Sequence, residues 1–189
     1  MKKQTQQIAP RIVVTKSSDQ EIQIEIDQKV ERWKLSMLLS WLLAWAYCGG
    51  VFIYYAVVAQ ALSDRIFFIV STSLWLYFFV RIGKAFLWRR MGKEKIWIRP
   101  GEMEIQNAFG SRGKKEKLKL TSIQKLGLIK SDPGNFLAFL DDSFWVIGGE
   151  RVGFVHGSSH FRVGKQLDIR SAENLVRVMD SAIKAYSKA

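Results

Sequence analysis

The sequence predicts a two-helix membrane hairpin joined to a mainly β or α+β cytoplasmic domain that ends in a helix. Residues 35–59 hold 25 residues without a charge, and residues 66–88 are apolar with charges only near their end. About 20 apolar residues at ~1.5 Å rise span the ~30 Å hydrocarbon core of a bilayer. After residue 88, short segments of alternating apolar residues are bounded by Gly, Pro and Ser, as in antiparallel sheets. The expected divisions are 1–34, 35–88 and 89–189.

The first 34 residues predict a β-hairpin behind a disordered start. Arg11–Thr15 and Glu21–Asp27 alternate as strands do, and KSSDQ joins them. An isolated hairpin is marginal in water, so we expect it to dock on the sheet that follows the membrane helices. Residues 1–9 carry no apolar pattern and are expected to be disordered.

Charge around the two apolar runs predicts their orientation. The link Gln60–Arg65 carries one acid and one base, whereas the outer flanks are basic: Lys29, Arg32, Lys34, Arg81, Lys84, Arg89, Arg90, Lys93 and Lys95. The positive-inside rule then places both termini in the cytoplasm. Trp33 and Trp88 are expected at the cytoplasmic interface. The first run is too long for a cleaved signal peptide.

Alternation in the C-terminal region predicts an antiparallel sheet or barrel. The expected strands are 95–99, 102–107, 115–120, 124–130, 151–156 and 160–163. A helix follows, with Ser171 as its N-cap. One of its faces is apolar: Ala172, Leu175, Met179, Ala182, Ile183 and Tyr186. Its polar face is mixed in charge, which favours a helix that covers the sheet over one that lies on a membrane.

The net charge of +12 is concentrated in residues 81–130, with fourteen bases and four acids. One interpretation is a topology signal with a solvated face. The other is docking on anionic lipid, at ~1 kcal/mol per base near the surface. The candidate contacts are Arg89, Arg90, Arg112, Lys114, Lys115 and Lys117. The last four surround one predicted turn, so we expect them to face lipid as a group. Nucleic acid is not expected, because the stretch lacks exposed aromatic residues set among the bases and contains no helix typical of groove binding.

Residues 131–150 form an aromatic-rich segment that does not fit the strand pattern. It contains Phe136, Phe139, Phe144 and Trp145, with a further strand expected at Phe144–Ile147. These side chains belong either to the core or to a surface that contacts the bilayer or a partner protein.

The sequence suggests no catalytic, metal or cofactor site. His156 and His160 are the only histidines and flank a predicted turn. Asp141 and Asp142 lie in a predicted loop and read as turn chemistry. There is no phosphate-binding Gly-rich loop and no nucleophile motif. Cys48 is the only cysteine, so no disulfide can form within the chain. We therefore expect no enzyme and no cofactor.

Two segments carry a resemblance to a known family. They are FLWRRMGKEKI at Phe86–Ile96 and GFVHGSSHFRVGKQLDIRSAENLV at Gly153–Val176. With the two membrane helices they resemble a bacterial family that has a membrane hairpin and a PH-like domain, mostly of unassigned function. The resemblance implies a PH-like split barrel capped by the C-terminal helix, in a multi-pass protein of the inner membrane. The first loop of the domain, Pro100-Gly101, is too short for inositide recognition.

Two functions are expected from these features. The first is a membrane-anchored interaction module, an accessory or scaffold subunit that binds a protein partner in the membrane. The alternative is a protein that binds or senses anionic lipid through the basic stretch and the aromatic segment.

Overall fold

The structure, a computed structural model, describes residues 4–17, 20–28, 30–110, 112–129 and 147–187. The chain divides into two compact units. One unit is Val30–Arg90, and the other combines Met1–Lys29 with Met91–Ala189. We call them the helical hairpin and the sheet domain. The predicted strands at the two ends of the chain therefore belong to a single unit.

The sheet domain contains a six-stranded antiparallel sheet in which the strands are neighbours in chain order. The strands are β1 (Gln4–Ala9), β2 (Ile12–Ser17), β3 (Glu21–Asp27), β4 (Gly92–Arg99), β5 (Glu102–Phe109) and β6 (Lys115–Lys119). Since β3 pairs with β4, the helical hairpin is inserted between two neighbouring strands of one sheet. The expected docking of the N-terminal hairpin on the C-terminal sheet is confirmed by this pairing.

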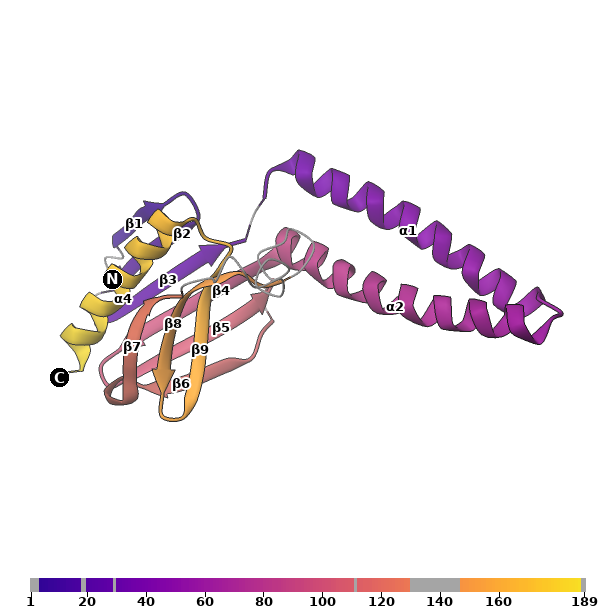
Figure 1. The fold of residues 1–189 in the computed structure, drawn as a ribbon. Helices are drawn as coiled ribbons and strands as arrows, with labels where there is room; N and C mark the ends of the chain where they lie inside the picture. The colour runs from indigo at the N-terminus through magenta and orange to yellow at the C-terminus, as the bar shows by residue number, and fades with distance from the viewer. Residues whose placement is uncertain (1–3, 18–19, 29, 111, 130–146, 188–189) are drawn as a thin grey trace. The chain divides into compact units, whose positions relative to one another are not determined.

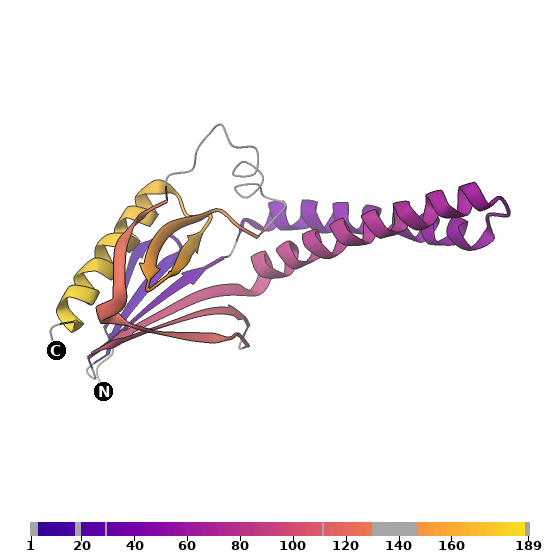
Figure 2. The same ribbon diagram turned by 60° about the horizontal axis from the view of Figure 1, so that its bottom comes forward.

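A second, three-stranded sheet follows. A short 3₁₀ helix, Leu120–Ser122, leads into β7 (Ile123–Leu128), which pairs with β8 (Glu150–His156), and β8 pairs with β9 (Ser159–Lys165). This sheet and helix α4 (Ile169–Tyr186) lie on the same face of the six-stranded sheet (Figures 1 and 2). The expected layout, antiparallel strands closed by a C-terminal helix, is thus present.

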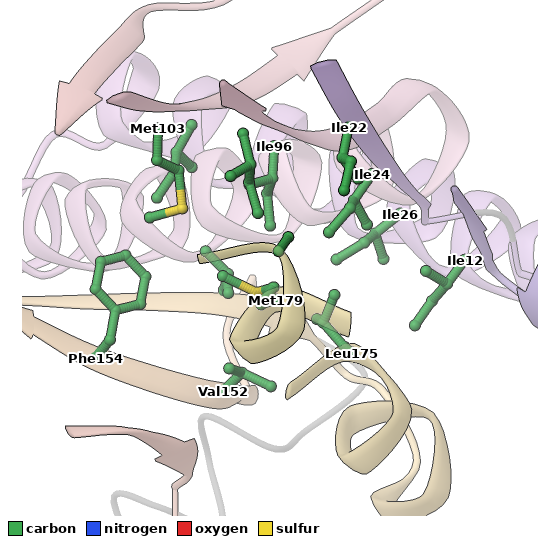
Figure 3. Packing of buried hydrophobic residues seen from close by; sticks show 14 of the residues in the cluster. Ile12, Ile22, Ile24, Ile26, Ile96, Met103, Val152, Phe154, Leu175 and Met179 are labelled. Carbon is green, nitrogen blue, oxygen red and sulfur yellow. The ribbon is translucent and has the colours of Figure 1, made fainter. Parts of the chain in front are cut away.

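The core lies between the large sheet and this covering layer. Alternate residues of β2 to β6 face inward, and the most deeply buried include Ile12, Ile24, Ile26, Ile96, Ile98 and Met103. Val152 and Phe154 of β8 and Leu175 and Met179 of α4 meet them from the other side (Figure 3). Burial of these side chains supplies the main driving force for folding, at ~25 cal/mol per Å² of apolar surface.

Three details of the sheet domain differ from expectation. Residues 4–9 form strand β1 instead of a disordered start, because their backbone pairs with β2. The N-cap of α4 is Asp168, whose carboxylate accepts the Ser171 N–H at 3.0 Å, so Ser171 is in the first turn and buried. The strand expected at Phe144–Ile147 lies largely outside the described residues, and its described residue, Ile147, is in a bend.

The helical hairpin consists of α1 (Arg32–Val58) and α2 (Leu62–Met91), both long and apolar enough to cross a membrane. Their packing centres on Trp75, whose indole N–H donates to the Trp45 carbonyl at 2.8 Å. A Cβ at Gly49 would lie 2.0 Å from the Trp75 ring, so only glycine admits this approach. Farther along the hairpin, the rings of Tyr55 and Phe68 stack at 5.2 Å. Small residues such as Gly49 permit close contacts between apolar helices.

Candidate functional site at the hairpin end of the sheet domain

Both connections to the helical hairpin leave the sheet domain at one end. Asp27, at the end of β3, pairs with Lys93, near the start of β4. The α1 helix begins at Arg32, and α2 runs into β4 without an intervening residue. We call this end of the sheet domain the hairpin end.

The turn between β5 and β6 lies at the hairpin end as well. Phe109 pairs with Gly92, and the Gly110 N–H donates to the Met91 carbonyl at 3.1 Å. The exposed residues Arg112 and Lys114 are on this turn. Two of the predicted lipid contacts therefore lie beside the chain segment that joins α2 to the sheet.

The other four predicted lipid contacts are placed differently. Arg89 and Arg90 belong to the last turn of α2, in the helical hairpin. Lys115 and Lys117 point to the outer face of the six-stranded sheet, which is the face away from the core. Lys114 instead lines a cleft between β6 and β9. We had expected the four bases around the turn to face lipid as a group, but they do not share one face. Their contact with lipid stays a prediction.

Lys115 and Lys117 are already paired with an acid. The carboxylate of Glu104 lies 3.2 Å from Lys117, 3.6 Å from Lys115 and 3.7 Å from Arg99. Burial acts to raise the pKa of Glu104, but the Lys117 hydrogen bond and the surrounding cations hold that pKa below its ordinary value. Lys115 also lies 4.6 Å from the centre of the Trp97 ring. One buried carboxylate thus partners both lysines that β6 places on this face.

Further ion pairs tie the N-terminal strands to the rest of the outer face. Lys93 contacts Glu25 at 2.5 Å, and Arg99 contacts Glu21 at 3.2 Å. The Glu25 hydrogen bond raises the pKa of Lys93. Both pairs join β3 to β4 and are partly exposed, so each stabilises the fold by less than about 1 kcal/mol. They help to fix the register between β3 and β4, the two strands that flank the helical hairpin in the sequence.

A buried polar network occupies the inner side of the hairpin end. Glu94, which is 1% exposed, accepts the backbone N–H of Gly164 at 2.7 Å and of Lys165 at 3.1 Å. The Lys165 ammonium lies 3.3 Å from Glu94 and donates to Asn107 at 3.0 Å. The network thus links β4, β5 and β9 through charge-assisted hydrogen bonds.

Arg11 extends this network to the N-terminal strands. Its guanidinium donates to the Gln28 side chain at 2.6 Å and to the carbonyls of Asp27 and Gln166, both at 2.8 Å. Burial lowers the pKa of Arg11, against the opposing effect of the nearby carboxylates, chiefly Glu94. The side chain bridges the β1–β2 turn, the exit of β3 and the exit of β9.

This network was missed by sequence reasoning, although one signal was present. In KEKIWIR, Glu94 shares its alternation with Ile96 and Ile98, which are core residues. A charged residue in the inward register of a buried strand requires a partner. The partner, Lys165, is remote in sequence and could not be identified from spacing.

The aromatic-rich segment also joins the sheet domain at the hairpin end. Before it, the Ile129 N–H donates to the Arg151 carbonyl at 2.8 Å. After it, the Gln166 N–H donates to the Gly149 carbonyl at 2.7 Å, and Glu150 pairs with Lys165. Its predicted contact residues Phe136, Phe139, Phe144 and Trp145, together with Asp141 and Asp142, lie outside the described residues.

His156 has structural contacts, whereas His160 is exposed. His156 Nε2 accepts the Lys119 N–H at 3.2 Å, which ties the end of β8 to β6, and the His156 ring meets Phe161 edge-on. Among the described residues, no group of three or more His, Cys, Asp and Glu side chains is arranged to hold a metal ion.

No protein-family model matches the chain, and neither curated proteins nor solved structures yield a match. The class is therefore set by the architecture itself: a two-helix apolar hairpin inserted between neighbouring strands of an antiparallel sheet domain. The structure bears out the expected layout of antiparallel strands followed by a C-terminal helix.

Proposed function

We propose that this chain is a membrane-anchored interaction module, an accessory or scaffold subunit of a membrane protein complex in the inner membrane. In this proposal the hairpin crosses the bilayer twice and both termini are cytoplasmic. The PH-like sheet domain is then held at the membrane surface by its two short connections. The observation that carries the proposal is a row of small residues on α1.

Ser36, Ser40, Ala44 and Cys48 recur at every fourth position of α1, and all four are exposed. At 100° per residue they form an oblique stripe, and its first three members point away from Trp45 and Gly49, which contact α2. Apolar helices associate in membranes through such small residues, because they allow close backbone approach. A lipid tail has no need of this shape, so the stripe favours a protein helix as the neighbour.

The main test is copurification from native membranes, followed by mass spectrometry. A stoichiometric companion should accompany the wild-type chain, and Ala44→Leu should release it by filling the stripe. Gly50→Leu is the matched control, since it adds bulk to another exposed position with open space around it. Equal retention by both variants, or no companion at all, would count against the proposal. Crosslinking through Cys48, the chain's only cysteine, would locate the contact.

Orientation has a separate test. Reporter fusions at Ser63 and after Ala189 should report the outer and the cytoplasmic side, respectively. A periplasmic signal from the C-terminal fusion would contradict the proposed topology.

Anionic-lipid binding is the second candidate, and one observation favours it. The turn that carries Arg112 and Lys114 is hydrogen-bonded to Met91, the last residue of α2, which also carries Arg89 and Arg90. Bases within a Debye length of an anionic surface are attracted to it.

Hydrogen exchange of residues 110–114 would test the lipid candidate with the full chain in nanodiscs. Lipid contact predicts slower exchange in anionic than in neutral discs at low salt, and no difference at high salt. Arg112→Gln with Lys114→Gln should remove the effect. If the exchange rate does not depend on lipid charge, these bases do not bind lipid and serve only as a topology signal.

A further inference from the structure

A small depression lies on the outer face of the three-stranded sheet, away from the core. Its volume is about 310 Å³, near the lower limit of small-ligand sites. Gly127 and Gly153 pair across β7 and β8 in its lining, and Lys125, His160 and Arg162 contribute the polar side chains. The depression therefore combines half-buried glycine backbone with three groups able to donate to an anion.

Lys125 is placed there by an irregularity of β7. The register shifts between Gln124 and Gly127, and Lys125 adopts a left-handed backbone with φ of 52°. This conformation is disfavoured for a residue with a side chain, and bulges of this kind redirect side chains near functional sites. Sheet formation alone does not require it.

Among the described residues, the bases around the depression lack the acidic partners that bases on the six-stranded sheet have. Lys115 and Lys117 share Glu104, as described above, and Lys93 pairs with Glu25. Within the described parts of the chain, Lys125 and Arg162 have no acidic side chain at ion-pair distance. Glu116 lines the neighbouring cleft with His160 and Arg162, yet forms no ion pair with either.

The glycine at position 153 keeps the depression open. Arg162 lies directly opposite Gly153 in the β8–β9 register. A Cβ at Gly153 would lie 3.0 Å from Ile129 Cγ1, so any side chain would press on the lining. The position thus brings half-buried glycine backbone next to the arginine.

We propose that this depression binds a phosphate-bearing anion, held by Lys125, Arg162 and His160 over the Gly127–Gly153 backbone. Arginine matches the geometry of phosphate oxygens in a fork, and lysine adds a second charge-assisted hydrogen bond. The phosphate belongs either to a soluble phosphorylated molecule or to a lipid headgroup. The site uses none of the residues of the α1 stripe or of the β5–β6 turn, so it goes beyond both functions proposed above.

The test uses the full chain in nanodiscs of zwitterionic lipid, titrated by calorimetry with inorganic pyrophosphate. A second arm measures binding of lipid vesicles that contain phosphatidic acid to the same discs. Binding of pyrophosphate identifies a site open to soluble phosphates, and binding of the vesicles alone identifies a headgroup site. No binding in either arm would overturn the proposal.

Variants separate a built site from general attraction. Lys125→Gln with Arg162→Gln should weaken binding at least about tenfold, as expected for loss of charge-assisted contacts. Lys16→Gln with Arg177→Gln removes the same charge from exposed positions on β2 and α4 and should change affinity less than about twofold. Equal losses in the two double variants would show nonspecific electrostatic binding and overturn the proposal.

Gly153→Val tests the shape of the site without changing its charge. It should reduce affinity while circular dichroism shows the sheet domain still folded, since valine suits a strand and the atoms it would press on belong to the Ile129 side chain. If Gly153→Val leaves the affinity unchanged, the Gly127–Gly153 backbone is not part of the binding site.

Discussion

Glu94 of β4 accepts the backbone N–H of Gly164 of β9 at 2.7 Å, which fastens the six-stranded sheet to the three-stranded one. Gly164 has a φ of +76°, and a Cβ there would lie 3.0 Å from Leu167. Position 164 therefore favours glycine, because its backbone conformation and the closeness of Leu167 both disfavour a side chain. The contact is buried and lies at the end of the domain from which the helices leave.

Replacing Glu94 should be among the most damaging single changes in the sheet domain. Glu94→Gln removes the charge that faces the Lys165 ammonium, so we expect a loss of about 3 kcal/mol in the free energy of unfolding. Denaturant unfolding of the chain in detergent, followed by circular dichroism, would measure it. Glu102→Gln, at a more exposed residue, should cost less than about 1 kcal/mol. Similar losses for the two variants would refute the importance of the network.

The adjacent glycines of α1 offer a matched pair. Gly49→Ala should lower the melting temperature of the hairpin, because its Cβ would overlap Trp75 and displace the indole N–H from the Trp45 carbonyl. Gly50→Ala meets nothing within 4 Å and should be neutral or stabilise the helix by up to about 1 kcal/mol. Tryptophan fluorescence during heating would distinguish them. Equal melting temperatures for the two variants would contradict the close approach of α1 and α2 at Gly49.

The N-terminal strands should be integral to the sheet domain. Ile24 is fully buried on β3, so Ile24→Ala should cost about 2–5 kcal/mol of unfolding free energy. Gln23, its neighbour on the opposite face, pairs with Trp97, and Gln23→Ala should cost below about 1 kcal/mol. Chemical denaturation would compare them. A mild effect at Ile24 would mean that β3 is not part of the core.

The stability of α4 should depend on acid pH through Asp168. The Ser171 hydrogen bonds lower the pKa of this carboxyl below its ordinary 3.8, so the folded state favours the ionised form. This stabilisation is complete well above pH 3.8 and is lost as the pH falls through the lowered folded pKa. Asp168→Ala should therefore destabilise the domain by about 1 kcal/mol at pH 7. The difference from wild type should shrink near pH 2, and a difference independent of pH would exclude the capping role.

Local patterning was enough to predict most elements of this chain. Alternating isoleucines mark β3 and β4, and the two long apolar runs mark the helices, although α1 begins before its run and α2 extends beyond its run at both ends. Strand β1 was missed because QTQQIA has no apolar alternation, and its order comes from pairing with β2. Asp168 was overlooked as a cap because Ser171 satisfies the same preference three residues later.

The candidate site was less predictable, for a physical reason. Arg112 and Lys114 were identified by charge, but their position beside Met91 depends on the β4–β5 register. The partners Glu94 and Lys165 are brought together only when the two sheets pack. Interactions of this range leave no periodic signal in a single sequence.

The insertion of both helices between β3 and β4 has a consequence for biogenesis. During translation, β1 to β3 leave the ribosome before α1 and α2. The β3 edge therefore stays unpaired until both helices and β4 have been synthesised. An exposed edge with isoleucines at alternate positions invites pairing with other chains. The nascent protein can close its core only when β4 has followed α2 and paired with β3. Because β3 pairs with β4, the sheet can be completed only after the chain has turned back between α1 and α2.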